Sequence, residues 1–136
     1  MSSQIQFFKK NVVDIDYDVT ITVTDSVATN TGESIADFMR NRKNTTAWVT
    51  TGSSDSGNTT VIVDYITSRD IDNIILVKHN FKSYTVKYWN GSTYTDFSSA
   101  IGPSNDTNET TRYSFTQVTT SKIQIVINST QTADAD

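Results

Sequence analysis

One stretch decides the fold of this chain: Ile71-Asp-Asn-Ile-Ile-Leu-Val-Lys-His-Asn-Phe-Lys-Ser-Tyr-Thr-Val-Lys-Tyr-Trp-Asn-Gly-Ser-Thr-Tyr-Thr-Asp-Phe97. In its second half, side chains alternate in the period-two pattern of a strand that has one face in a core. The inward set is Tyr84, Val86 and Tyr88, and the outward set is Thr85, Lys87 and Trp89. Asn90-Gly91 follows at once and predicts a two-residue type I′ turn, because both residues tolerate a positive φ. The stretch therefore predicts a strand and a hairpin, with the return beginning at Tyr94.

The same period-two pattern occurs on both sides of this stretch. It marks strands at 19–24, 60–65 and 122–127, and shorter segments at 11–16, 47–51 and 113–115 bring the expected total to about eight. One short helix is expected near 34–42, where Ser34 can cap the first turn. Strands of this length and spacing predict an all-β protein, a β-sandwich or jelly roll.

A chain of 136 residues is the size of one domain. We expect an N-terminal arm and first strand at 1–18, the sandwich at 19–128, and a flexible C-terminal tail at 129–136. The absence of cysteine excludes disulfides and thiolate chemistry. The N-terminus lacks the apolar core of a signal peptide, and no apolar run is long enough to cross a membrane. We therefore expect a product made in the cytoplasm, with no membrane partner.

The net charge of −4 is small, and the basic residues are scattered along the chain. Arg40, Arg42 and Lys43 form the densest basic cluster, which fits the solvated end of a segment better than a phosphate grip. Nucleic-acid binding requires a clustered positive patch. No nucleic-acid partner is expected.

The chain also lacks an arrangement typical of catalysis. Its one histidine, His79, stands beside Asn80 and is interpreted as a hydrogen-bonded turn residue. No serine lies in a nucleophile-elbow pattern, and Asp14, Asp16 and Asp18 fit a solvated strand edge. We predict no catalytic residues and a non-enzymatic protein.

No cofactor is expected, although a calcium site is left open. Asp55 and Asn58 are the candidates, because their loop can supply the oxygen ligands that calcium prefers. The loop does not contain the Asp-X-Asp-X-Asp-Gly pattern.

Several segments resemble a known family when taken in order. They are Asn44-Thr-Thr-Ala-Trp48, Val61-Ile-Val-Asp-Tyr65, Ile71-Asp-Asn-Ile-Ile-Leu76 and the Tyr84–Tyr94 hairpin. Together they resemble the discoidin, or coagulation-factor C-type, domains of the galactose-binding-like superfamily, and the resemblance implies a sandwich of that type. The chain departs from the family in lacking its disulfide and in carrying Lys122 and Gln124 where arginines are common.

A narrower resemblance rests on Leu76-Val-Lys-His-Asn-Phe-Lys82. This segment is similar to one in discoidin-like modules of tailed-phage virion proteins. It implies a bacteriophage structural protein of the virion, in the tail or as capsid decoration, that is made in the host cytoplasm. Such a protein would dock other virion proteins and form homo-oligomers, with Trp89, Phe7 and Phe8 as contact anchors.

A second hypothesis is a carbohydrate-binding module that attaches to a host-surface glycan. Trp89 is the best candidate for stacking on a sugar ring, because it alternates out of the inward set. The same side chain can instead pack under a loop or against a neighbouring subunit. Saturable quenching of tryptophan fluorescence by a soluble glycan would distinguish the two hypotheses.

Overall fold

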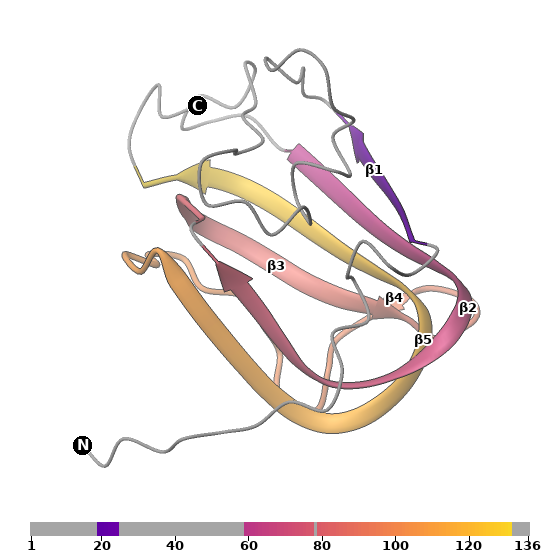
Figure 1. Ribbon diagram of the computed structural model, residues 1–136. Helices are drawn as coiled ribbons and strands as arrows, with labels where there is room; N and C mark the ends of the chain where they lie inside the picture. The colour runs from indigo at the N-terminus through magenta and orange to yellow at the C-terminus, as the bar shows by residue number, and fades with distance from the viewer. Residues whose placement is uncertain (1–18, 25–58, 78, 132–136) are drawn as a thin grey trace.

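A computed structural model describes residues 19–24, 59–77 and 79–131 of the chain (Figure 1). They form β1 (Thr20–Thr24), β2 (Thr59–Val77), β3 (Phe81–Trp89), β4 (Tyr94–Thr95) and β5 (Thr110–Thr130). The strands make one antiparallel sheet in the order β1-β2-β5-β3-β4. The predicted all-β sandwich is confirmed.

The sheet curls into two layers because its two longest strands bend in the middle (Figure 1). The register of β2 on β5 shifts between Asp64 and Arg69, and pairing then resumes across the bend. The segments predicted as strands at 60–65, at 113–115 and at 122–127, together with the strand expected early in the Ile71–Phe97 stretch, are therefore parts of two continuous strands. Ile66 lies inside the bend with φ of 63°, and the side chain of Asp64 accepts its N–H at 2.9 Å.

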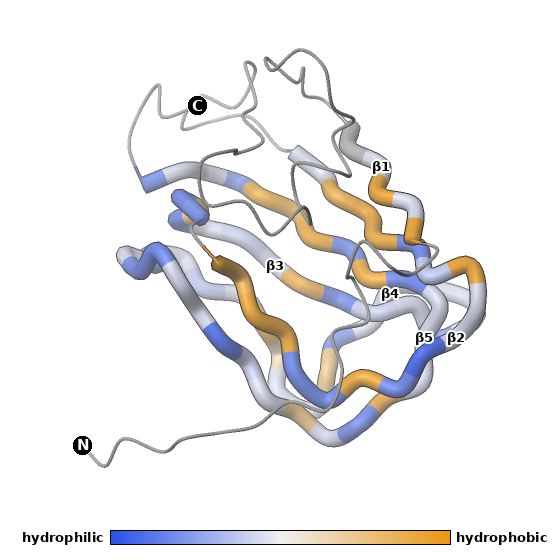
Figure 2. Tube along the Cα trace, viewed as in Figure 1, coloured by the Kyte–Doolittle hydropathy of each residue, from blue (hydrophilic) through white to orange (hydrophobic). Residues whose placement is uncertain are grey.

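The core lies between the two layers, and the predicted inward sets fill it. Val61 and Val63 on β2, Tyr84 and Val86 on β3, and three isoleucines of β5 are buried: Ile123, Ile125 and Ile127. Buried and partly buried positions alternate over residues 59–65 of β2 and 122–127 of β5, whereas β2 ends in an apolar run at 74–77 (Figure 2). Aromatic contacts then connect the layers, since Phe97 lies 5.1 Å from Tyr88 and 4.0 Å from Phe115, centroid to centroid.

The predicted hairpin is present, but its tip is one residue further along than the sequence indicated. Trp89 pairs with Tyr94, and the N–H of Asn90 donates to the carbonyl of Thr93 at 3.1 Å. The side-chain oxygen of Asn90 accepts the N–H groups of Ser92 and Thr93, at 2.9 and 3.0 Å. Gly91, with φ of 101°, and Ser92 therefore form the tip, and the predicted type I′ turn at Asn90-Gly91 is wrong. The Asn90 side chain is the reason, because it engages the loop N–H groups itself.

Some predicted elements lie outside the described residues, namely the helix near 34–42 and the strands at 11–16 and 47–51. The described residues contain no helix, and hence none that could span a membrane.

At the C-terminal end of the described residues, β5 continues through Thr130, and the N–H of Gln131 donates to the carbonyl of Asn80 at 2.7 Å. The sandwich therefore extends three residues past 128.

Candidate functional site

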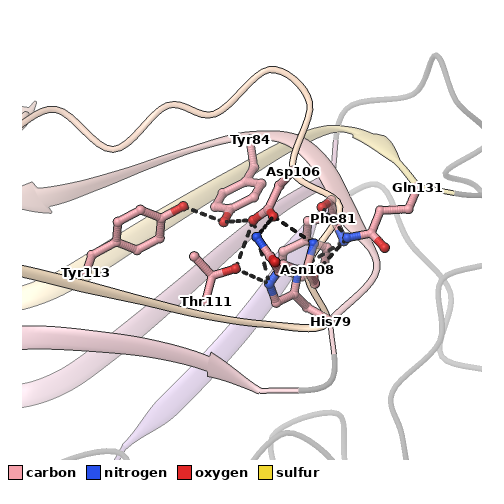
Figure 3. A network of polar contacts seen from close by, with 8 residues as sticks. All are labelled: His79, Phe81, Tyr84, Asp106, Asn108, Thr111, Tyr113 and Gln131. Carbon is pink, nitrogen blue, oxygen red and sulfur yellow. Dashed lines mark hydrogen bonds and ion pairs between the residues drawn. The ribbon is translucent and has the colours of Figure 1, made fainter. Parts of the chain in front are cut away.

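Two polar regions lie at the two ends of β3. The first is a buried network around Asp106 (Figure 3). The loop that carries Asp106 runs along the free edge of β3. There the N–H of Val86 donates to the carbonyl of Ile101, and the N–H of Tyr84 donates to the carbonyl of Pro103. The N–H of Asp106 donates to the carbonyl of Lys82 at 2.8 Å. These backbone bonds hold the carboxylate between the two layers.

Both oxygens of the Asp106 carboxylate are hydrogen-bonded. Oδ1 accepts the backbone N–H and the side-chain amide of Asn108, each at 2.9 Å. Oδ2 accepts the hydroxyls of Tyr84 at 2.8 Å and Thr111 at 2.9 Å. Since Tyr84 donates to the carboxylate, the hydroxyl of Tyr113, at 2.6 Å, donates to Tyr84. Burial alone would raise the pKa of Asp106, but these donors outweigh it and lower the pKa to about 2.

His79 belongs to the same network, and its contacts fix its tautomer. Its Nδ1 accepts the N–H of Phe81 at 3.2 Å, so the neutral ring carries its proton on Nε2. That proton is donated to the Thr111 hydroxyl at 3.0 Å. Burial lowers the pKa of His79, and the Asp106 carboxylate at 3.9 Å partly opposes this. The interpretation of His79 as a hydrogen-bonded turn residue is confirmed.

The direction of these hydrogen bonds excludes nucleophilic chemistry at Thr111. A nucleophilic hydroxyl must give its proton to a base. Here the base is absent, because His79 donates to Thr111 and Thr111 donates to a carboxylate whose pKa is about 2. Tyr84 also keeps its proton, since burial raises its pKa well above the usual value. The network joins the loop around Asp106 to β3 and β5.

The second region is the outer face of the sheet at the far end of β3. Trp89 is only partly buried there and faces away from the inward set, as the alternation predicted. Tyr94, directly opposite on β4, packs edge-to-face against it, with the centroids 5.2 Å apart and the planes at 64°. Tyr94 was not predicted as a contact residue, although pairing the two hairpin strands would have placed it beside Trp89. The pair presents two aromatic surfaces on a hydrogen-bonded hairpin.

Two exposed ion pairs lie on the same outer face. Lys122 on β5 and Asp64 on β2 are register partners, with Nζ 3.4 Å from Oδ2. Lys87, two residues before Trp89, contacts the carboxylate of Asp96 at 3.6 Å. The buried Thr120 hydroxyl contacts the carbonyls of both Trp89, at 2.7 Å, and Lys122, at 3.0 Å, and so holds β3 and β5 together beside the aromatic pair.

Of the side chains predicted to contact a partner or glycan or to bind calcium, only Trp89 lies within the described residues. Phe7 and Phe8, and the calcium candidates Asp55 and Asn58, lie outside them. Within the described part of the chain, no group of three or more His, Cys, Asp or Glu side chains could hold a metal ion. Asp106 was not singled out, because in sequence it is one polar residue in a polar loop.

Solved structures share this β-sandwich fold, which is of the galactose-binding-like type. No protein-family model matches the chain, and no curated protein does. Chitosan-binding module 1 of a chitosanase/glucanase from Paenibacillus sp. IK-5 superposes with a TM-score of 0.70 at 15% identity, over 91% of this chain and 90% of the module. Module 2 of that enzyme, in complex with chitotriose, gives 0.65 at 12% identity, over 90% and 91%.

A third similar structure is CpGH89CBM32-5 from Clostridium perfringens, in complex with GalNAc-β-1,3-galactose. Its TM-score is 0.64 at 15% identity, over 82% of this chain and 85% of that chain. These neighbours are carbohydrate-binding modules. At such identities the likeness establishes the fold, and the function of this chain has to be argued from its own side chains.

Proposed function

We propose that this domain is a non-catalytic carbohydrate-binding module that holds a glycan against the Trp89–Tyr94 pair. The observation that supports the proposal is this partly exposed aromatic pair on the outer face of the sheet. Aromatic rings bury the apolar face of a sugar, and nearby polar side chains pair with its hydroxyls. The neighbours' ligands, chitotriose and GalNAc-β-1,3-galactose, provide the first probes.

The polar groups around the pair fit this role. Lys122 lies near Trp89 on the neighbouring strand β5, and Lys87 precedes Trp89 on the same face of β3. Their side chains are exposed over 40% and 38% of their surface, which leaves room for contact with sugar hydroxyls. Gln124, the register partner of Lys87, adds a partly exposed amide.

Isothermal titration with these probes and a glycan array tests the proposal. Trp89→Ala and Tyr94→Ala should each reduce affinity by at least about fivefold, since stacking on one ring contributes on the order of 1–3 kcal/mol. Thr116→Ala is the matched control, because Thr116 is exposed on the other layer, and it should bind as the unmodified domain does. If no glycan binds, or if Trp89→Ala binds normally, the proposal fails.

The phage-virion hypothesis remains a prediction, together with its virion partners, homo-oligomer and location. Nothing in the described residues favours protein docking over glycan binding at Trp89. Immunogold labelling of purified phage particles tests it directly, and regular labelling at one position is the expected result for a virion part. The predicted absence of a cofactor, with calcium as its alternative, is tested by repeating the titrations with calcium and with EDTA.

A further inference from the structure

The charged side chains beside the Trp89–Tyr94 pair influence which sugars this face can bind. Within the part of the chain that the structure describes, two ion pairs lie on the outer face there, Asp64–Lys122 and Lys87–Asp96, and each is neutral as a pair. Each ammonium group has a carboxylate partner, at 3.4 Å for Lys122 and 3.6 Å for Lys87. Asp64 is held further, since its Oδ1 accepts the N–H of Ile66 at 2.9 Å.

This pairing disfavours charged sugars. A glucosamine ammonium would need a free carboxylate, but Asp64 and Asp96 each already face a lysine. A uronic acid would need a free cation, but Lys87 and Lys122 each already face an aspartate. A charged sugar could displace one member of a pair, but that would leave the displaced member without its partner. The exchange brings little net gain in affinity, because the new ion pair is exposed and contributes no more than the one that it replaces.

The same pairing suits neutral sugars. An ammonium group has three donors, and a carboxylate has about four acceptor positions, so each ion pair retains unused donors and acceptors side by side. A sugar hydroxyl is both a donor and an acceptor. Two adjacent hydroxyls can thus accept from lysine and donate to aspartate without separating the pair.

We infer that the Trp89–Tyr94 face binds neutral glycans with adjacent free hydroxyls and discriminates against cationic and anionic ones. The inference rests on the proposed function and specifies its ligand. It separates this chain from the structural neighbours described as chitosan-binding, because fully deacetylated chitosan is cationic.

The test compares matched glycans on the purified domain by isothermal titration. N-acetylated and fully deacetylated chitotriose form one matched pair, and neutral galactose oligomers and galacturonate oligomers form the other. We expect the neutral member of each pair to bind at least about fivefold tighter, with an affinity that changes little between low and high salt. Equal binding, or tighter and salt-sensitive binding of a charged member, overturns the inference and leaves the proposed function standing. If none of these glycans and no glycan on the array binds, the proposed function itself fails.

Two variants test the charge argument itself. Lys122→Met frees the Asp64 carboxylate and should raise affinity for deacetylated chitotriose by up to about fivefold. Asp96→Asn frees Lys87 and should do the same for the galacturonate oligomer. Asp70→Asn is the control, because Asp70 is exposed beyond the bend in β2, where its carboxylate accepts the hydroxyl of Thr119. Unchanged preferences in both variants, with unchanged circular dichroism, would overturn the inference.

Discussion

The two ends of β3 use tyrosine and aspartate for opposite purposes. At one end, Tyr84 and Asp106 are buried and hydrogen-bonded to each other. At the other end, Tyr94 and Asp96 are open to solvent, where Tyr94 packs on Trp89 and Asp96 pairs with Lys87. The strand that joins them is only nine residues long.

The two ends differ in whether their hydrogen-bonding groups already have partners within the protein. Every hydrogen-bonding group around the Asp106 carboxylate is directed at another group of the protein, so nothing is left for a ligand. The ion pairs at the other end retain donors and acceptors that face water. A buried polar group must be paired, whereas an exposed group can exchange its water for a ligand. The buried end therefore serves stability, and the exposed end can serve binding.

The largest effect expected from this comparison is the loss of the buried carboxylate. Asp106→Ala leaves two hydroxyls and the Asn108 N–H without their acceptor and should cost about 3 kcal/mol or more of unfolding free energy. Asp96→Ala removes an exposed ion pair and should cost less than about 1 kcal/mol. Urea denaturation of both variants measures the difference. Equal losses would mean that the two ends do not differ as described.

Acid should weaken the buried end in two separate steps. The lowered pKa of His79 means that its neutral form is favoured in the fold, so its contribution is complete above the unfolded pKa near 6.5 and is lost as pH falls below it. The lowered pKa of Asp106 gives a contribution that is complete above 3.8 and is lost as pH falls towards about 2. His79→Gln should flatten the first step of a stability–pH curve, and Asp106→Asn the second. If a variant still shows its step in the stability–pH curve unchanged, that step belongs to another titratable group.

The sequence predicted the fold well because the strands carry their own signal. Val61, Val63, Ile123 and Ile125 occur at a period of two, and such local alternation determines which face is buried. The continuity of β2 could not be predicted. Its bend passes through a positive φ at Ile66, which a sequence pattern does not indicate for a β-branched residue.

The candidate site was predicted only in part, since its members come from separate strands. The alternation placed Trp89 outside, but its neighbours Tyr94 and Lys122 follow from the pairing of β3 with β4 and β5. The Asp106 network was missed for the same reason. Asp106 meets Tyr84 across 22 residues of sequence, and no local pattern in the polar loop indicates that contact.

A smaller effect is expected at the hairpin tip. Gly91 has φ of 101°, a conformation that other residues rarely adopt, so Gly91→Ala should cost about 1 kcal/mol although nothing lies within 4 Å of an added Cβ. Gly102→Ala is the control, because its φ is not in that region and its new Cβ would make an ordinary contact with Thr85 at 3.7 Å. Urea denaturation should show the larger loss for Gly91. If Gly102→Ala loses more unfolding free energy than Gly91→Ala, the positive φ of Gly91 does not account for the loss at the tip.

The smallest effect has the opposite sign and concerns the bend in β2. Ile66 is 63% exposed and has φ of 63°, a conformation that is unfavourable for a β-branched residue. Ile66→Asn removes little buried surface and introduces a side chain that tolerates this conformation, so it should stabilise the domain by about 0.5 kcal/mol. Ile75→Asn is the control, since Ile75 is also exposed, at 43%, but lies in a regular part of β2, where the same change should not stabilise. Stabilisation at Ile66 alone would mean that backbone strain is held in the bend of β2. A loss at Ile66 would mean that its side chain contributes contacts that outweigh the strain.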